Sequence, residues 1–315
     1  MKTQVKTIIL AVILLAGITS CSKNDDPTND ETYPTAVHIT DAPIDNTNVK
    51  GAFVTITDVK IDGNSIEGFS KTTIDLMAYQ NGSTKLLGNL DLKSRMYSNI
   101  SLVIDTASDA NGNAPGCYIL TTDNTKHALA SVSNEIQIND SFEVLRSNAN
   151  KMVIDFDLRK TITSQTESSN AFDFVTASEL SNGLRIVNDL ETGEIQGNVS
   201  DSENTSDKIV VYAYKKGSFN AESETKGQGA SKIEFANAVT SSVVNNITGS
   251  YELNFLDEGE YELHFASYNK TDNSNTFKFS AMLNVESSTS VNLGSIKVDA
   301  NSQLSASVLV LGHLQ

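Results

Sequence analysis

Apolar and polar residues alternate with a period of two through most of this chain, and this pattern, more than any other feature, restricts the chain to β-strands. The run KMVIDFDL at residues 151–158 places its apolar side chains, from Met152 to Leu158, on one face and its aspartates on the other, as a half-buried antiparallel strand does. A short helix or turn is expected near residues 73–79. The chain is therefore predicted to be all-β, with two consecutive antiparallel β-sandwich domains. Shorter alternating runs, separated by turn-rich segments, lie at residues 35–40, 52–61, 100–104, 117–121 and 135–138.

A ten-residue repeat marks the second half of the chain. YELNF at residues 251–255 and YELHF at residues 261–265 are joined by LDEGE. Each copy places its tyrosine, leucine and phenylalanine on one face, so both copies are expected to pack against one core. We interpret them as paired edges of a single sandwich, with Gly259 permitting the turn between them.

The amino terminus carries an export signal. Lys2 and Lys6 precede an apolar run at residues 8–18, and small polar residues lead into Cys21, which is the charged, apolar and cleavage-site order of a signal peptide. The run is well below the ~20 apolar residues of a membrane-spanning helix. The stretch ending in Cys21 resembles the lipobox of bacterial lipoproteins, which implies a diacylglycerol attached to the Cys21 sulfur. A plain signal peptide followed by a free thiol is the alternative.

The residues after Cys21 are polar and acidic. Ser22 to Asp26 lead into a mixture of Pro, Thr, Asn, Asp and Glu without apolar residues, so residues 21–32 are predicted to form a flexible acidic tether after a signal peptide at residues 1–20. The lysine-then-acidic order resembles the signal that Bacteroidetes-type bacteria use to export lipoproteins to the cell surface. The resemblance implies an outer-membrane location facing the exterior, with a periplasmic orientation left open.

The charge balance is strongly acidic. The chain has 23 basic and 39 acidic residues, a net charge of −16, and removal of Lys2 and Lys6 with the signal peptide makes it −18. Such a chain repels nucleic acid, so no nucleic-acid partner is expected. With Cys21 lipidated, Cys117 has no second cysteine for an internal disulfide. Stability must then come from packed cores.

Two parts of the chain resemble known families. VHITDAPIDNTNVKGAFVTITDVKI at residues 37–61, TTIDLMAYQNG from Thr72 and MVIDFDLRKTI from Met152 resemble the bacterial domain of unknown function 4382 family. That resemblance implies a secreted β-sandwich without assigned catalytic activity, and we assign it residues 33–188. GEIQGNVSD, IVVYAY and the YELNF/YELHF repeat resemble carboxypeptidase regulatory-like, prealbumin-type sandwiches, which we assign to residues 189–315.

No catalytic, cofactor or metal site is predicted. The four histidines are scattered singly, without the spacing of a metal site or an apparent catalytic partner: His38, His127, His264 and His313. His264 is expected on the outward face of its strand. The motif Gly-x-Ser-x-Gly is absent, and GQGASK from Gly227 is interpreted as an interstrand loop rather than a phosphate loop.

Three acidic loops raise a binding hypothesis. Asp109, Asn111 and Asn113 alternate beside Asp105, and residues 201–207 form a second oxygen-rich loop. Calcium prefers six to eight such oxygens, but turn chemistry explains the same residues and is the favoured interpretation. In TDAPID, Asp41 and Asp45 flank Pro43, and we expect Asp41 to cap its own turn rather than to bind a ligand.

These observations predict a non-enzymatic surface lipoprotein that acts as a binding, adhesion or accessory module. Its expected partners are the membrane, through the lipid on Cys21, and a surface glycan or protein; no cofactor is expected. A structural subunit of a surface assembly is the alternative within the same class. A carboxylate-dependent glycan hydrolase is the competing class, and the chain has no tryptophan for sugar stacking.

Overall fold

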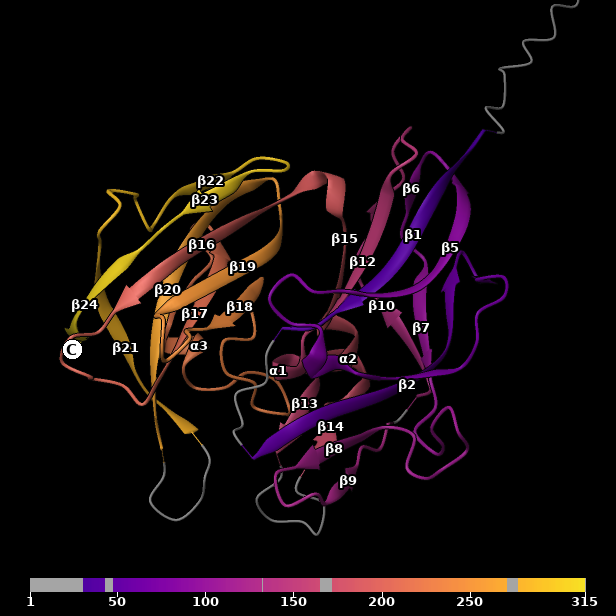
Figure 1. Cartoon of the computed structure of the whole chain (residues 1–315), viewed down its shortest axis with the longest axis horizontal. Helices are drawn as coiled ribbons and strands as arrows, with labels where there is room; N and C mark the ends of the chain where they lie inside the picture. The colour runs from indigo at the N-terminus through magenta and orange to yellow at the C-terminus, as the bar shows by residue number, and fades with distance from the viewer. Residues whose placement is uncertain (1–30, 43–47, 132, 165–171, 271–276, 315) are drawn as a thin grey trace, which may run out of the picture. The chain divides into compact units, whose positions relative to one another are not determined.

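The computed structural model describes residues 31–42, 48–131, 133–164, 172–270 and 277–314 (Figure 1). The chain divides into two units, Met1–Glu31 and Thr32–Gln315, and all of the described strands belong to the second. The described part is built almost entirely of strands joined by turns. The predicted all-β sandwich class is therefore confirmed.

The strands before residue 189 form two main sheets, which we call the first sheet group. One has the order β15-β12-β1-β5 and the other the order β10-β7-β2-β8-β9, with β3 and β4 pairing to β2. Two small pairs, β6 with β11 and β13 with β14, complete the group. Their bounds are β1 Thr32–Thr40, β2 Val49–Ile61, β3 Asn64–Ser65, β4 Thr72–Asp75, β5 Lys85–Lys93, β6 Met96–Tyr97, β7 Ile100–Ile104, β8 Tyr118–Thr121, β9 Lys126–Ala128, β10 Glu135–Ile138, β11 Phe142–Glu143, β12 Asn150–Phe156, β13 Ile162–Ser164, β14 Phe172–Phe174 and β15 Leu184–Asn188.

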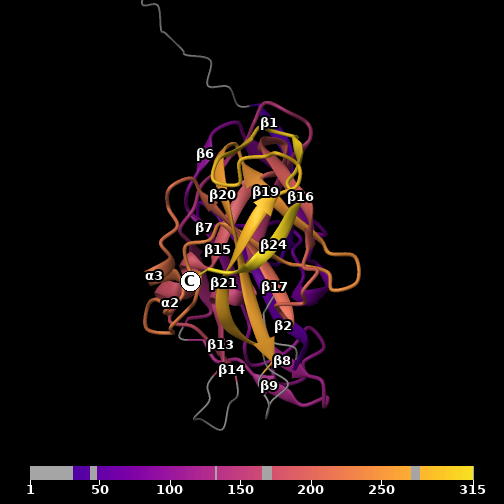
Figure 2. The same cartoon turned by 90° about the vertical axis from the view of Figure 1, so that its left-hand side faces the viewer.

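The strands after residue 191 form the second sheet group, which Figure 2 brings toward the viewer. Its order is β18-β17-β20-β21-β24-β16-β19, with β22 pairing to β20 and β23 to β16. The bounds are β16 Thr192–Ser200, β17 Lys208–Lys215, β18 Thr240–Val243, β19 Ser250–Asp257, β20 Gly259–Lys270, β21 Phe277–Ser287, β22 Ile296–Val298, β23 Gln303–Ser305 and β24 Val308–His313.

The helices are short, with three to six residues each, and lie between strands. Each begins at a polar side chain that accepts a hydrogen bond from a backbone amide of the first turn, as N-caps do; α2, for example, has a capping box between Thr176 and Glu179. The expected short helix near residues 73–79 is η1, a 3₁₀ turn capped by Asp75. Their bounds are η1 Leu76–Ala78, α1 Leu158–Thr161, α2 Ala177–Asn182, η2 Asp189–Glu191 and α3 Ala221–Glu224.

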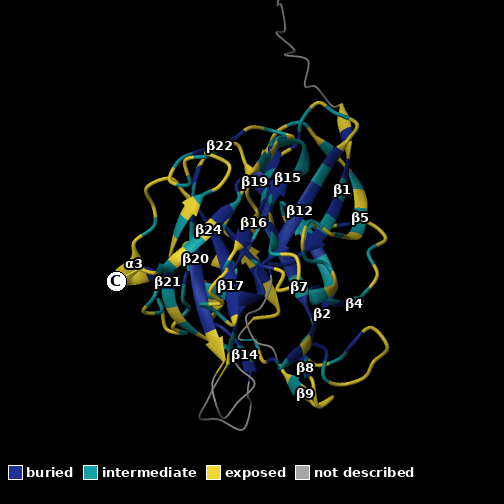
Figure 3. Cartoon of the chain, turned by 60° about the vertical axis from the view of Figure 1, so that its left-hand side comes forward, coloured by how far each residue is buried: buried dark blue, intermediate teal, exposed yellow. Residues whose placement is uncertain are grey.

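The strand predicted at residues 151–158 differs from the expectation in its pairing, its burial and its end. β12 pairs antiparallel with β15 but parallel with β1, and its interior is buried on both faces, as the dark blue of Figure 3 shows. It ends at Phe156, because Asp157 caps α1 and Leu158 is already helical. The aspartate face is covered because the side chain of Arg185 in β15 pairs with Asp155. A half-buried strand was therefore the wrong prediction.

The two copies of the repeat are not hydrogen-bonded to each other. β19 pairs with β16, whereas β20 pairs with β17, β21 and β22, so the expected paired edges are wrong. The expectation that both copies pack against one core is confirmed for all of their apolar residues except Phe255. The rings of Tyr251 and Phe265 meet there edge to face with centroids 5.9 Å apart.

Phe255, the last residue of the first copy, leaves that shared core. Ile195 pairs with Leu253 and Gly193 with Leu256, so Asn254 and Phe255 bulge from β19. The φ of Phe255 is +56°, and its side chain clusters with Val153 and Val187 of the first sheet group. The bulge thus makes one apolar contact between the two groups.

A second apolar cluster covers the other face of β17. Ile209, Val211 and Ala213 face the main core of the second group, and Tyr212 and Tyr214 point to the opposite face. There they pack with apolar side chains of the segment between β17 and β18, residues 216–239. The ring of Phe235 stacks on Tyr212 with centroids 4.1 Å apart. We call this segment the cover segment.

Candidate functional site

Asp41 joins the three segments that resemble one family. Its carboxylate accepts hydrogen bonds from the Gln80 side chain (2.9 Å) and the Leu158 amide (3.1 Å), and its own amide donates to the Tyr79 carbonyl (3.0 Å). Burial is the main reason that the pKa of Asp41 lies well above its usual range. The described partners of this carboxylate therefore come from distant segments, not from its own turn as expected. Pro43 and Asp45 lie outside the described residues.

Five charged side chains gather beside Asp41, at the end of β12. We call Asp155, Asp157, Arg159, Lys160 and Arg185 the seam cluster. The Asp157 carboxylate caps α1 by accepting from two backbone amides and pairs with the Arg159 guanidinium at 2.9 Å. Arg185 donates to Asp155 at 2.9 Å. The aspartates are thus held by buried cations, which is how buried carboxylates are stabilised.

The pKa values of the cluster reflect its burial. Burial raises the pKa of Asp155 despite the nearby Arg185. Desolvation lowers the pKa of Lys160 to about 8, although Asp157 acts against the shift. Both shifts follow from the cost of keeping a charge away from water.

The cations of the cluster also bind backbone carbonyls of the second sheet group. Arg159 donates to the carbonyls of Glu234 (3.0 Å) and Phe235 (2.7 Å) in the cover segment, where Lys160 donates to the Ala238 carbonyl. Arg185 donates to the carbonyl of Phe255 at 2.5 Å. We call this line of contact the seam. The cluster therefore docks the two sheet groups.

The GQGASK loop takes part in the seam as well. Its Ser231 donates through its amide (3.0 Å) and its hydroxyl (2.7 Å) to Glu179 of α2. These bonds and those from Thr176 hold the pKa of Glu179 at about 2 against the effect of burial. Gly229 has a φ of +70°, a conformation that favours glycine, and a Cβ atom there would lie 2.2 Å from a Glu179 oxygen. The segment is an interstrand loop, as predicted.

A small pocket lies at the seam next to Asp41. It is lined by residues from both sheet groups, and polar side chains dominate its wall: Thr40, Asp41, Asp155, Thr240, Ser241 and Glu252. The space that a water molecule can occupy there is about 20 Å³. That is too small for a sugar ring, since ligand pockets typically hold about 300 Å³ or more.

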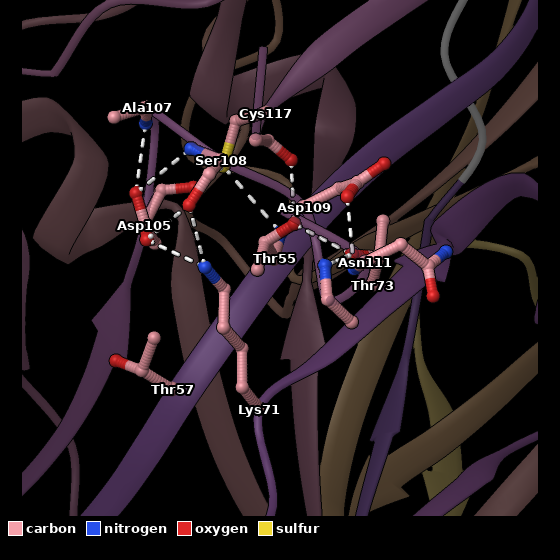
Figure 4. A network of polar contacts seen from close by, with 12 residues as sticks. Thr55, Thr57, Lys71, Thr73, Asp105, Ala107, Ser108, Asp109, Asn111 and Cys117 are labelled. Carbon is pink, nitrogen blue, oxygen red and sulfur yellow. Dashed lines mark hydrogen bonds and ion pairs between the residues drawn. The ribbon is translucent and has the colours of Figure 1, made fainter. Parts of the chain in front are cut away.

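The loop that suggested calcium is closed by an ammonium group and by its own amides (Figure 4). Lys71 Nζ lies 2.7 Å from Asp105 Oδ2 and 2.8 Å from Ser108 Oγ. The Asp109 carboxylate accepts from the amides of Asn111 (2.9 Å) and Asn113 (2.8 Å). Turn chemistry therefore accounts for this loop, as the sequence favoured.

Replacing Lys71 with methionine tests this assignment. The bond from Lys71 is the main cause that lowers the pKa of Asp105 to about 2, followed by the Ser108 amide. In Lys71→Met we expect carbon-13 NMR to show the pKa of Asp105 rising toward 3.8 while staying below it, because the amides remain. The lowered pKa stabilises the fold above pH 3.8 and this is lost as pH falls through about 2. The exposed Lys226→Met variant should leave Asp105 unchanged, and an unmoved pKa in Lys71→Met would refute the pairing.

The second oxygen-rich loop is held by similar bonds. Thr205 donates to the Asp201 carboxylate at 3.0 Å, and Asp207 accepts from the Lys270 amide at 2.8 Å. Throughout the described residues, no group of three or more His, Cys, Asp or Glu side chains lies close enough to hold a metal ion.

The histidines lie on four different strands. His38 contacts Thr84 at 2.8 Å and His127 contacts Thr121 at 3.3 Å. His264 does point away from the main core, but the cover segment shields it: Phe219 stacks on its ring with centroids 3.7 Å apart. Burial lowers the pKa of both His38 and His264. His313 lies on β24 and is exposed.

Cys117 is fully buried in the core of the first sheet group. Burial raises the pKa of its thiol to about 11, so the thiol stays protonated and unreactive at neutral pH. Cys21, the predicted lipid-attachment residue, lies outside the described residues. In the part of the chain that the structure covers, no helix has the length and apolar character to cross a membrane.

Arg159, Lys160 and Arg185 were not singled out from the sequence. All three follow or lie within buried strands, in DFDLRK and GLRIVN. A basic residue beside a buried apolar run in an acidic chain indicates a buried ion pair. This signal could have identified these three residues from the sequence. The carbonyls that these cations bind could not have been found, because they belong to segments far along the chain.

One part of the chain matches a known protein family. Residues 35–173 match the family model described as a domain of unknown function, DUF4382. The match contains Asp41, Gln80 and most of the seam cluster, including Asp155, Asp157 and Arg159. No curated protein sequence matches the chain.

Among solved structures, similarity is weak in sequence and in superposition. The Bacillus anthracis TIE protein is 11% identical, with 88% of this chain and 34% of that chain covered and a TM-score of 0.19. The chain thus spans about a third of that protein. The major pilin BcpA of Bacillus cereus is 11% identical (89% and 70% covered, TM-score 0.22), and the minor pilin GBS52 of Streptococcus agalactiae is 10% identical (90% and 97%, TM-score 0.20). These TM-scores are too low for the functions of those proteins to be compared with that of this chain.

Proposed function

We propose, from the match of residues 35–173 to the family model of DUF4382, that the protein is a non-enzymatic lipoprotein of the bacterial surface. It acts as a binding, adhesion or accessory module that projects two adjoining β-sandwiches from the outer membrane of a Bacteroidetes-type bacterium. The proposed domains are residues 33–188 and 189–315. The change of sheets between β15 and β16 supports this division.

The non-enzymatic part of the proposal rests on the structural role of the charged residues in the family motifs. Asp41, Asp155 and Asp157 are each at least nine-tenths buried, and their described partners are amides, a glutamine, a lysine and two arginines. A hydrolase would need two carboxyl groups facing a substrate across a cleft at ~5 to 9 Å. Here the three buried carboxylates are bound by amides, a glutamine and cations at the seam between the two sheet groups.

The lipid anchor rests on Cys21 and its surroundings. A tether of about ten residues would join Cys21 to the start of β1 at Thr32. At ~0.8 kcal/mol per buried CH₂, two or more acyl chains give lasting attachment where a single chain gives only marginal binding. The acidic tether would keep the sandwiches in water.

Binding and assembly are separated by two measurements on the full chain in mild detergent. A binding module should retain glycans on an array, or capture a defined partner, and should elute as a monomer at all concentrations. If glycan retention is lost when urea unfolds the protein and returns when the protein refolds, the folded surface is what recognises the glycan. Hydrolysis of any arrayed glycan would contradict the non-enzymatic proposal.

Assembly through strand edges is the second candidate, because β5 ends its sheet. It pairs with β1 on one side, and no strand lies beyond it in the sheet order of the described residues. Leu86 on β5 is 47% exposed. Edge strands of this kind can pair with another chain. Concentration-dependent oligomers on a sizing column that Leu86→Lys abolishes would favour this candidate over the first.

A further inference from the structure

Two polar atoms in the wall of the seam pocket have no partner among the described residues. They are Asp155 Oδ1 and Ser241 Oγ. Asp155 is 3% exposed and Ser241 is 5% exposed, so neither reaches bulk water. A buried polar atom without a partner costs about 1–3 kcal/mol, and folded proteins rarely leave one in this state.

The two atoms belong to different sheet groups and line the same space. Asp155 lies on β12 of the first group, and Ser241 lies on β18 of the second. Both line the pocket together with Asp41. Its usable space of about 20 Å³ exceeds the ~10–15 Å³ that one water requires.

We propose that this pocket binds a single water molecule that bridges Asp155 Oδ1 and Ser241 Oγ across the seam. A carboxylate oxygen only accepts hydrogen bonds, whereas a serine hydroxyl both donates and accepts. A water molecule can donate to Asp155 and accept from Ser241 at once. Its second proton has a further acceptor in the same wall, the Asp41 carboxyl group. Three partners are typical of a buried water.

The electrostatics of the pocket favour a neutral occupant over a metal ion. The other oxygen of Asp155 already lies 2.8 Å from Arg185, so this carboxylate is neutralised without a bound ion. No set of three acidic, histidine or cysteine ligands is close enough for a metal in the parts of the chain that are described. Burial raises the pKa of Asp41 well above its usual range, which favours its neutral form.

A water at this position would complete the docking of the two sheet groups. Arg159, Lys160 and Arg185 bind carbonyls of the second group directly, whereas Asp155 and Ser241 would meet only through the bridging molecule. Such a bridge is nearly as favourable as a direct hydrogen bond. The inference stands on the seam alone and does not depend on the proposed function.

A crystal structure of the full chain, at a resolution that shows ordered waters, tests the proposal. We expect one density peak within hydrogen-bonding distance of both atoms, without anomalous signal in crystals soaked with rubidium or terbium. Ser241→Ala should abolish the peak and lower the Tm by about 2–4 °C. Ser242→Ala is the matched control, because Ser242 is equally buried but accepts from the Glu252 amide; it should keep the peak.

Three outcomes would overturn the proposal. The first is a wild-type structure with no peak between the two atoms, and the second is a direct hydrogen bond from Ser241 to Asp155. The third is an anomalous signal at the site, which would identify a cation instead. The wild-type crystal decides the question by itself if Ser241→Ala fails to fold.

Discussion

Cys21→Ser is expected to move the protein from the membrane fraction to the soluble fraction. Serine cannot form the thioether that carries the diacylglycerol, so the variant would lose all of its acyl chains. At ~0.8 kcal/mol for each buried CH₂, removal of two chains lowers the membrane affinity by many orders of magnitude. Fractionation after export, with mass spectrometry of the amino-terminal peptide, measures both the location and the lipid.

Ser22→Ala serves as the matched control, because it changes the adjacent residue and leaves the thiol in place. This variant should stay lipidated and membrane-bound. Protease treatment of intact cells then distinguishes an exterior from a periplasmic orientation of the wild-type chain. A Cys21→Ser protein that remains in the membrane fraction at the wild-type level would contradict the proposed anchor.

Arg159→Ala is expected to lower the free energy of unfolding by about 3–5 kcal/mol. Arg159 is 9% exposed, and the change leaves the buried Asp157 carboxylate without its closest cation. It also removes the hydrogen bonds that Arg159 donates to the carbonyls of Glu234 and Phe235. Lys160, whose Nζ lies 3.7 Å from Asp157, can replace only part of the lost charge. Urea denaturation with an unchanged m-value would show a loss of stability without a change in the unfolded state.

Two further variants define what Arg159 contributes. Arg159→Lys keeps the charge but loses the planar fork that reaches two carbonyls and a carboxylate together, so its stability should fall between that of the alanine variant and that of wild type. Arg146 is exposed, and Arg146→Ala should stay within about 0.5 kcal/mol of wild type. An Arg159→Ala protein as stable as the Arg146→Ala protein would refute the docking role.

The alternation of apolar and polar residues revealed the strands because burying a polar side chain is unfavourable at each position separately. Residues 35–40, 100–104, 117–121 and 135–138 all fall within or almost within observed strands. The same reasoning failed at β12, where aspartates alternate with apolar residues as on a solvated strand. The burial of Asp155 depends on Arg185, which is thirty residues away and pairs with it only after β15 has docked. A single strand carries no sign of that partner.

The repeat shows a second limit of the sequence. YELNF and YELHF share the positions of their apolar residues, yet Phe255 turns away from the core that Phe265 joins. The difference comes from the bulge opposite Glu194, which depends on the pairing of β19 with β16. Strand register is a property of two segments, so the repeat alone could not reveal it.

The candidate site was predicted in part. TDAPID and MVIDFDLRKTI were both among the motifs that resemble one family, and the structure brings Asp41 beside Asp155 and Asp157. The role of these residues in docking the sheet groups was not predicted. It depends on backbone carbonyls of the cover segment, and any residue type can supply a carbonyl.

The position of β1 has a mechanical consequence. The chain enters β1 at Thr32, and this strand lies between β12, which it pairs with over Thr35–Thr40, and β5, which it pairs with over Thr32–Ile39. A pull transmitted along residues 21–31 would act on a strand that is hydrogen-bonded on both flanks, not on an edge strand that can peel away. A force on the anchored protein would therefore act on many hydrogen bonds of β1 at the same time. The strand nearest the predicted anchor is thus arranged to resist shear.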